Sequence, residues 1–126
     1  MDESWHEFVQ AFNSGRFYAA HEAAERIWAS RGYPPYDVFR GLTQLAVALA
    51  HIQKGNLIGA ARVLRKASDL LIVPSCPFWT AEVVRETESL LLAEDPTAAL
   101  MRERLWIPEA FDQSMLHQPD GPRRSD

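Results

Sequence analysis

The sequence contains a single cysteine, Cys76, among its 126 residues. One cysteine excludes an intrachain disulfide and any zinc site built from several cysteines, and it is typical of a protein of the reducing cytoplasm. Long hydrophobic runs are also missing. The longest uninterrupted apolar stretch, residues 45–50, is far short of the ~20 residues that cross a bilayer. We therefore expect a cytoplasmic protein with no membrane span.

Basic charge is scarce as well. Thirteen Lys and Arg stand against seventeen Asp and Glu, which gives a formal net charge of −4. This balance argues against the broad basic surface of a nucleic-acid-binding protein. The N-terminal residues, MDESWHEF, are acidic and lack the basic and apolar regions of a signal peptide. We expect neither a nucleic-acid partner nor a secretory leader.

The residues that favour β-strands are the third scarce group. Val, Ile and Thr together supply 16 residues, whereas Ala and Leu supply 30. Ala and Leu lose little rotamer freedom in a helix, while β-branched residues lose more. No stretch alternates strictly between apolar and polar residues. The sequence therefore predicts an all-α chain, short enough to form one domain.

Glycine, proline and capping residues divide this chain into five to six helices. They are expected at residues 3–12, 17–30, 37–53, 56–72, 79–93 and 97–105, with Asn56 as the N-cap of the fourth. After residue 112 only Met115 and Leu116 are large and apolar. We therefore predict a single all-helical domain over residues 1–111 and a disordered tail over residues 112–126.

Two of the predicted helices begin alike. Residues 15–20 (GRFYAA) match residues 55–60 (GNLIGA) at an offset of 40, each stretch following one helix and opening the next. Glycine turns and small residues at close crossings are typical of tetratricopeptide hairpins. The expected architecture is an antiparallel array of such helical hairpins.

In the predicted helix 17–30, His21 lies at the edge of the apolar face, four residues before Glu25. Residues four apart on a helix are neighbours, so both side chains of this pair are able to bind the same metal ion. The alternatives are a half-buried histidine satisfied by Glu25, or an ordinary surface pair.

The predicted helix 37–53 carries a second group of unusual polar residues. Arg40, Gln44 and His51 share one side of it, but their neighbours there are small and apolar, namely Gly41, Val47 and Ala48. Such a helix is expected to be covered on both sides, by its own chain or by a second subunit. This expectation includes a homo-oligomer formed through helix 37–53. The alternative is that the polar side faces water.

His21, Glu25 and His51 together make two imidazoles and one carboxylate. This is the ligand set of many catalytic zinc and non-haem iron sites, which keep a position open for water. We predict these residues as ligands of a divalent metal (zinc, iron or manganese), with Glu25, Gln44 and Arg40 as candidate catalytic residues acting on an unknown substrate. Two alternatives stay open, a non-enzymatic interaction module and a structural hydrogen-bond network.

Residues 12–28, FNSGRFYAAHEAAERIW, followed by residues 39–46, FRGLTQLA, and then His51, resemble the motifs of domain of unknown function family 309. The family consists of small bacterial and archaeal proteins, and the resemblance covers roughly residues 8–72. It implies an all-helical domain, and some members are labelled predicted metal-dependent hydrolases. The motif positions that it carries over are His21, Glu22, Glu25, Trp28, Gln44 and His51; Arg40 and Thr43 depart mildly from the family pattern.

Overall fold

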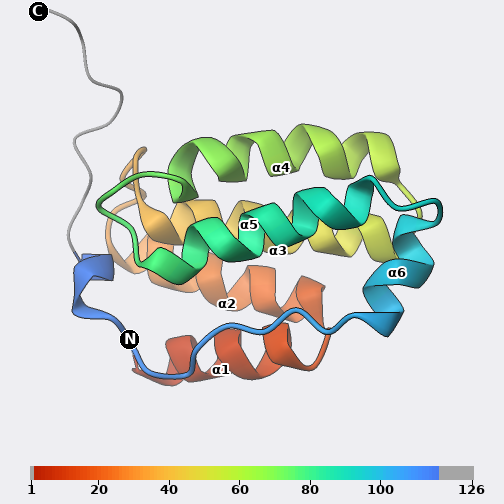
Figure 1. Ribbon diagram of the computed structural model, residues 1–126. Helices are drawn as coiled ribbons and strands as arrows, with labels where there is room; N and C mark the ends of the chain where they lie inside the picture. Colours follow the sequence, from red (N-terminus) through yellow and green to blue (C-terminus); the bar gives the residue numbers. More distant parts are fainter. Residues whose placement is uncertain (1, 117–126) are drawn as a thin grey trace, which may run out of the picture.

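The computed structural model describes residues 2–116, which form six α-helices, one short 3₁₀-helix and no β-strand (Figure 1). The elements are α1 (Asp2–Asn13), α2 (Phe17–Ser30), α3 (Val38–Gln53), α4 (Leu57–Leu71), α5 (Phe78–Leu91), α6 (Pro96–Arg102) and the 3₁₀-helix η1 (Gln113–Leu116). The all-α prediction is confirmed. No helix in this part of the chain is long and apolar enough to cross a membrane.

Helices α1 to α4 lie side by side in an antiparallel row, with α3 between α2 and α4 (Figure 1). Helix α5 packs on one side of this row, mainly against α4, and α6 covers the end at which α4 begins. The side of α2 and α3 that points away from α5 carries no helix of the described chain. That side holds the candidate site.

The helix boundaries follow from local chemistry. Asp37 and Asn56 cap α3 and α4, since their side chains accept hydrogen bonds from the backbone N–H of Phe39 and Gly59. The predicted cap at Asn56 is thus confirmed. Gly15 follows the end of α1, the first helix of the first hairpin. Its φ of +79° lies in the left-handed region that favours glycine. The helix predicted at residues 97–105 is observed as α6. It ends at Arg102, and Glu103 already has an extended backbone.

The extended segment after α6 returns along α1 (Figure 1). The Asn13 side chain holds it at both amide atoms: Nδ2 donates to the carbonyl of Ile107 at 3.0 Å, and Oδ1 accepts from the Ile107 N–H at 2.9 Å. The indole N–H of Trp5 donates to the carbonyl of Glu109 at 2.9 Å. The C-terminal segment is therefore part of the packed domain.

Residues 113–116 belong to that segment too, although the sequence predicts a disordered tail from residue 112. They form η1, in which Met115 is fully buried, and Arg31 Nη2 donates to the carbonyl of Leu116 at 3.4 Å. The ordered part therefore extends past residue 111, because one methionine finds room in the core. The rest of the predicted tail, residues 117–126, lies outside the described residues.

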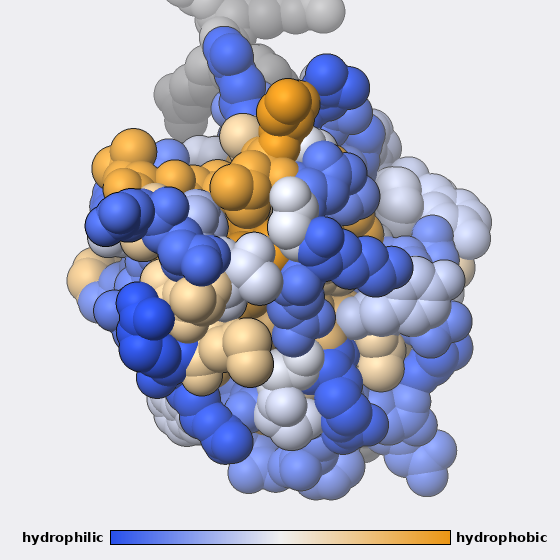
Figure 2. All heavy atoms as spheres, turned by 90° about the vertical axis from the view of Figure 1, so that its right-hand side faces the viewer, coloured by the Kyte–Doolittle hydropathy of each residue, from blue (hydrophilic) through white to orange (hydrophobic). Residues whose placement is uncertain are grey.

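Exposed hydrophobic side chains occur at the end where α4 begins and α5 ends. Ile58 is 77% exposed and Leu92 is 88% exposed. Figure 2 shows this end, where the hydrophobic side chains are interrupted by hydrophilic ones. Scattered exposure of this kind is normal for a globular domain.

Candidate functional site

The candidate site lies along the seam between the antiparallel helices α2 and α3. His21 and Trp28 face the seam from α2, and Arg40, Gln44 and His51 face it from α3; all five are half-buried. Because the helices run in opposite directions, Trp28 lies next to Arg40, whose guanidinium is 5.7 Å from the indole centroid. At the other end of the seam His21 and His51 line the same pocket.

That pocket has a volume of about 270 Å³. Its walls come from the first turns of α2 and the last turns of α3: Tyr18, His21, Val47, Ala50, His51 and Lys54. Most of this lining is apolar, with two imidazoles, a phenol and an ammonium as its polar groups. Such a combination of an apolar wall and a few polar groups is typical of small-ligand sites.

The tautomer of neutral His21 is set by its own helix. Its Nδ1 lies 3.2 Å from the carbonyl oxygen of Tyr18. A carbonyl only accepts hydrogen bonds, so Nδ1 carries the proton and donates it. In the neutral ring this leaves Nε2 of His21 as an acceptor with a free lone pair.

The opposite tautomer is favoured at His51. Asn56 caps α4 by accepting from the Gly59 N–H through Oδ1 at 3.0 Å, so its amide nitrogen points the other way. That nitrogen, Nδ2, lies 3.3 Å from Nδ1 of His51 and donates to it. Neutral His51 therefore carries its proton on Nε2, as a donor. The pocket thus pairs one histidine acceptor with one histidine donor.

The wall that the described residues form around the pocket carries positive charge and no carboxylate. Lys54 contributes an ammonium group, which lies 6.0 Å from the centroid of the Tyr18 ring. The Tyr18 ring in turn lies 5.2 Å from the His21 imidazole, centroid to centroid. Because the charged group of the wall is this ammonium, the pocket favours an anionic or neutral ligand over a cation.

Glu25 and Glu22 do not complete a metal site with the two histidines. Both glutamates are exposed on α2, outside the pocket wall. Within residues 2–116 no group of three or more His, Cys, Asp and Glu side chains lies close enough to hold a metal ion. The residues present therefore do not fit the expected set of His21, Glu25 and His51 around one metal.

The polar residues of the seam do not form one hydrogen-bond network either. His21 bonds to Tyr18 and His51 to Asn56, whereas Gln44 Oε1 is buried without a hydrogen-bond partner in the described chain. Arg40 donates through Nη1 to the carbonyl of Pro35 at 2.8 Å, but its Nε is likewise buried and unpartnered there. The structural network considered from the sequence is thus not formed.

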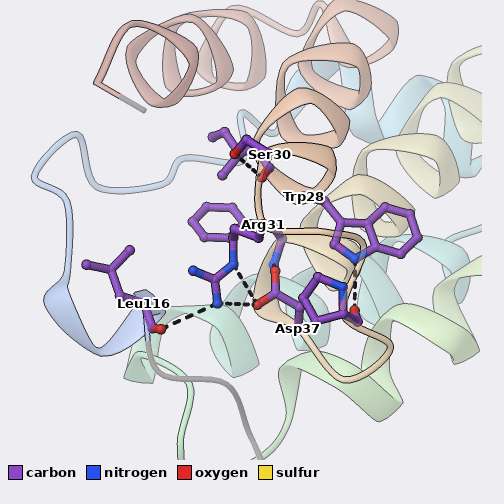
Figure 3. Close-up of polar contacts among 8 residues, drawn as sticks. Trp28, Ser30, Arg31, Asp37 and Leu116 are labelled. Atoms are coloured by element: carbon purple, nitrogen blue, oxygen red, sulfur yellow. Dashed lines mark hydrogen bonds and ion pairs between the residues drawn. The ribbon is translucent and has the colours of Figure 1, made fainter.

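A separate polar cluster joins α2 to α3 at the far end of the seam (Figure 3). Arg31 donates to Asp37 Oδ1 through Nε at 3.0 Å and through Nη2 at 2.7 Å. Asp37 is fully buried, and the Arg31 guanidinium also lies 5.5 Å from the Phe39 ring centroid. Beside it the indole N–H of Trp28 donates to Pro34 at 2.8 Å. Trp28, a motif position, therefore supports the interhelical loop.

Sequence reasoning missed three residues that shape the pocket, namely Tyr18, Lys54 and Asn56. Their spacing carried a usable signal. Tyr18 and Lys54 each lie three residues from a candidate histidine, one turn along the same helix, and Asn56 follows His51 by five residues at the predicted cap. The carbonyl of Tyr18 and the amide of Asn56, which fix the tautomers, require the folded geometry.

Fold and site together define a small all-helical domain built from antiparallel hairpins, with a histidine-containing pocket between the second and third helices. Residues 5–63 match the model of the family described as Domain of unknown function (DUF309), which confirms the resemblance seen in the sequence. An uncharacterized protein of Aquifex aeolicus (strain VF5) is 37% identical over 68 residues. The match spans 53% of this chain but only 20% of that relative. No solved structure matches the chain.

Proposed function

We propose that the pocket of His21 and His51 binds a small organic anion, with His21 placed to accept a proton and His51 to donate a hydrogen bond. The observation that carries this proposal is that the two rings are held in opposite tautomers. Tyr18 holds the proton of His21 on Nδ1, whereas Asn56 holds that of His51 on Nε2. In the neutral state one ring is then ready to accept a proton and the other to donate a hydrogen bond.

Size and charge support the same ligand class. A pocket of about 270 Å³ suits a compact molecule, near the lower end of ligand-site volumes. The ammonium of Lys54, in a wall to which residues 2–116 contribute no carboxylate, favours a carboxylate or phosphate group on the ligand.

The chemistry open to such a pair is general base catalysis assisted by a hydrogen-bond donor. A positioned base contributes typically ~10²–10⁴-fold to a rate when it reaches the reacting group. His21 is the candidate base through Nε2, His51 is the candidate hydrogen-bond donor through its Nε2–H, and Lys54 is the candidate anchor for the anion. Arg40 and Gln44 lie farther along the seam and Glu25 is exposed on α2, so none of the three is part of the pocket wall.

The competing proposal is the metal-dependent hydrolase expected from the sequence. Two imidazoles in one pocket support it, since zinc binds imidazole nitrogen readily. The described residues supply no third ligand there, and we derive no step through a metal. Glu25, one turn along α2 from His21, is the candidate that would have to move toward the pocket.

The two proposals are separated by titrations followed by NMR. Inorganic phosphate and acetate are the anion probes and Zn²⁺ is the metal probe, each added to ¹⁵N-labelled protein at constant pH. Anion binding predicts shifts of the His21 and His51 ring nitrogens that are lost in His21→Gln and His51→Gln but kept in the matched surface variant Glu82→Gln. If neither anion perturbs the two rings and Zn²⁺ binds at one equivalent, the metal proposal replaces ours.

A further inference from the structure

The apolar and polar groups of the pocket wall follow one another in a definite order along the seam. Val47, Ala50, His51 and Lys54 are spaced i, i+3, i+4 and i+7, which places them on one face of α3 and its C-cap. This face is roughly 10 Å long from the first residue to the last. The ammonium of Lys54 lies 6.0 Å from the centroid of the Tyr18 ring, at one end of the pocket. Val47 lies at the other end.

The two histidines lie between these ends. His51 precedes Lys54 by one turn, and His21 follows Tyr18 by one turn on α2, which runs in the opposite direction. Within the described chain each ring makes one hydrogen bond, and both use Nδ1 for it, with the Tyr18 carbonyl and the Asn56 amide respectively. Nε2 is therefore the nitrogen that each ring has left for a ligand, as an acceptor on neutral His21 and a donor on neutral His51.

We propose that the anion bound in this pocket is a hydroxycarboxylic acid with a hydrocarbon side group. This inference rests on the proposed function and names the chemical class of its ligand. A hydroxyl matches the two rings, because its one oxygen donates a hydrogen bond to Nε2 of His21 and accepts another from Nε2–H of His51. A carboxylate in the same place only accepts, so it would leave the lone pair of His21 without a donor.

The groups on either side of the histidines match the rest of the acid. The ammonium of Lys54 at one end suits the carboxylate, with which it makes a charge-assisted hydrogen bond. Val47 and Ala50 are apolar and half-buried, and a hydrocarbon group that covers them removes apolar surface from water. The volume of about 270 Å³ suits a compact side group such as one ring. Carboxylate, hydroxyl and hydrocarbon in the ligand thus meet ammonium, imidazoles and apolar side chains in the wall.

Four related compounds test this inference in NMR titrations of ¹⁵N-labelled protein at constant pH, read from the ring nitrogens of His21 and His51. Mandelate carries all three groups, whereas phenylacetate lacks the hydroxyl, methyl mandelate lacks the carboxylate charge and glycolate lacks the hydrocarbon. Mandelate should bind at least roughly tenfold more tightly than each of the other three. Equal binding of mandelate and phenylacetate overturns the hydroxy acid but leaves the anion site of the proposed function intact. If none of the four perturbs the two rings, the proposed function fails together with this inference.

Two variants connect each group of the acid to its residue. In Lys54→Met, which keeps the length of the side chain, mandelate and its methyl ester should bind alike. In His21→Phe, which keeps a ring, the difference between mandelate and phenylacetate should narrow, as read from the ring of His51. The surface variant Glu82→Gln is the matched control and should retain both differences in full. Differences that persist unchanged in Lys54→Met and His21→Phe contradict the placement of the acid in the pocket.

Discussion

Asn56 uses the two ends of one side-chain amide for two purposes, capping α4 and fixing His51. Its oxygen accepts from the Gly59 N–H at 3.0 Å, and its nitrogen lies 3.3 Å from Nδ1 of His51. A Cβ built on Gly59 would lie 2.6 Å from that nitrogen, so glycine leaves the space in which the amide sits. The cap of one helix thereby sets the tautomer of a histidine on the helix before it.

Asn56→Asp should invert the tautomer of His51. The carboxylate keeps the cap by accepting from Gly59, but it has no N–H to give, so Nδ1 of neutral His51 must become the donor. Long-range ¹H–¹⁵N spectra of the histidine rings should show the proton moving from Nε2 to Nδ1, while the melting temperature stays within a few degrees of wild type. Asp95→Asn, a cap exchange on α6, is the control. An unchanged His51 spectrum would contradict the assigned role of Asn56.

The helices were predictable because their signals are local. Residues 17–30 match α2, and the other boundaries differ by up to three residues, where propensity competes with tertiary packing. The burial of Met115 was not predictable, because a single apolar residue in a polar stretch gives no periodicity. Met115 occupies a gap that exists only once the helices and the segment bound by Asn13 have packed together.

The position of the site was predictable from the sequence, but the orientation and the hydrogen-bond partners of its side chains were not. Spacing predicted that His21 and His51 belong to neighbouring faces of two helices, and both line one pocket. Spacing alone does not show that Glu25 is exposed to solvent, because a small rotation of α2 about its axis determines whether this side chain lies in the seam or on the surface. The partners that fix each ring, a carbonyl and a capping amide, leave no pattern of their own in the sequence.

Asp37→Ala should destabilise the protein by about 3–5 kcal/mol, because it leaves the Arg31 guanidinium without its ion-pair partner and removes the cap of α3. Only 16% of the Arg31 side chain is exposed, so water replaces little of the lost interaction. Urea denaturation measures the change. Asp95→Ala removes an exposed cap with no ion pair and should cost only about 1 kcal/mol. Equal losses in the two variants would contradict a role for the ion pair.

Gly41→Ala should destabilise the contact between α3 and α4. A Cβ at this position would lie 2.6 Å from Cδ2 and 2.7 Å from Cγ of Leu71, and 3.1 Å from Cβ of Leu70. Overpacking of this kind costs about 1–3 kcal/mol, more than the roughly 1 kcal/mol that alanine gains in helix propensity. The double variant Gly41→Ala/Leu71→Ala should be more stable than Leu71→Ala alone. Additive losses would show that the two positions do not clash.

Met115→Ala should destabilise the domain by about 2–5 kcal/mol, as expected for a fully buried methionine. The neighbouring Leu116 is 44% exposed, so Leu116→Ala should cost much less. Thermal and urea unfolding of the two variants measure the difference. Similar small losses in both would mean that residues 113–116 contribute little to the domain.

Cys76 should react slowly and should make the stability depend on pH in alkaline solution. Burial, together with the negative charge of Asp37, raises the pKa of its thiol from 9.0 to about 11. At pH 8 the thiolate is then about a hundredfold scarcer than for an unperturbed thiol, and alkylation by iodoacetamide should slow accordingly. As the pH rises from 9 toward 11 the unfolded chain loses the thiol proton while the folded chain keeps it, so unfolding becomes easier. Wild type should therefore lose stability relative to Cys76→Ala across this window. A constant difference between the two proteins from pH 8 to 11 would show that the thiol has the same pKa in the folded and unfolded chain.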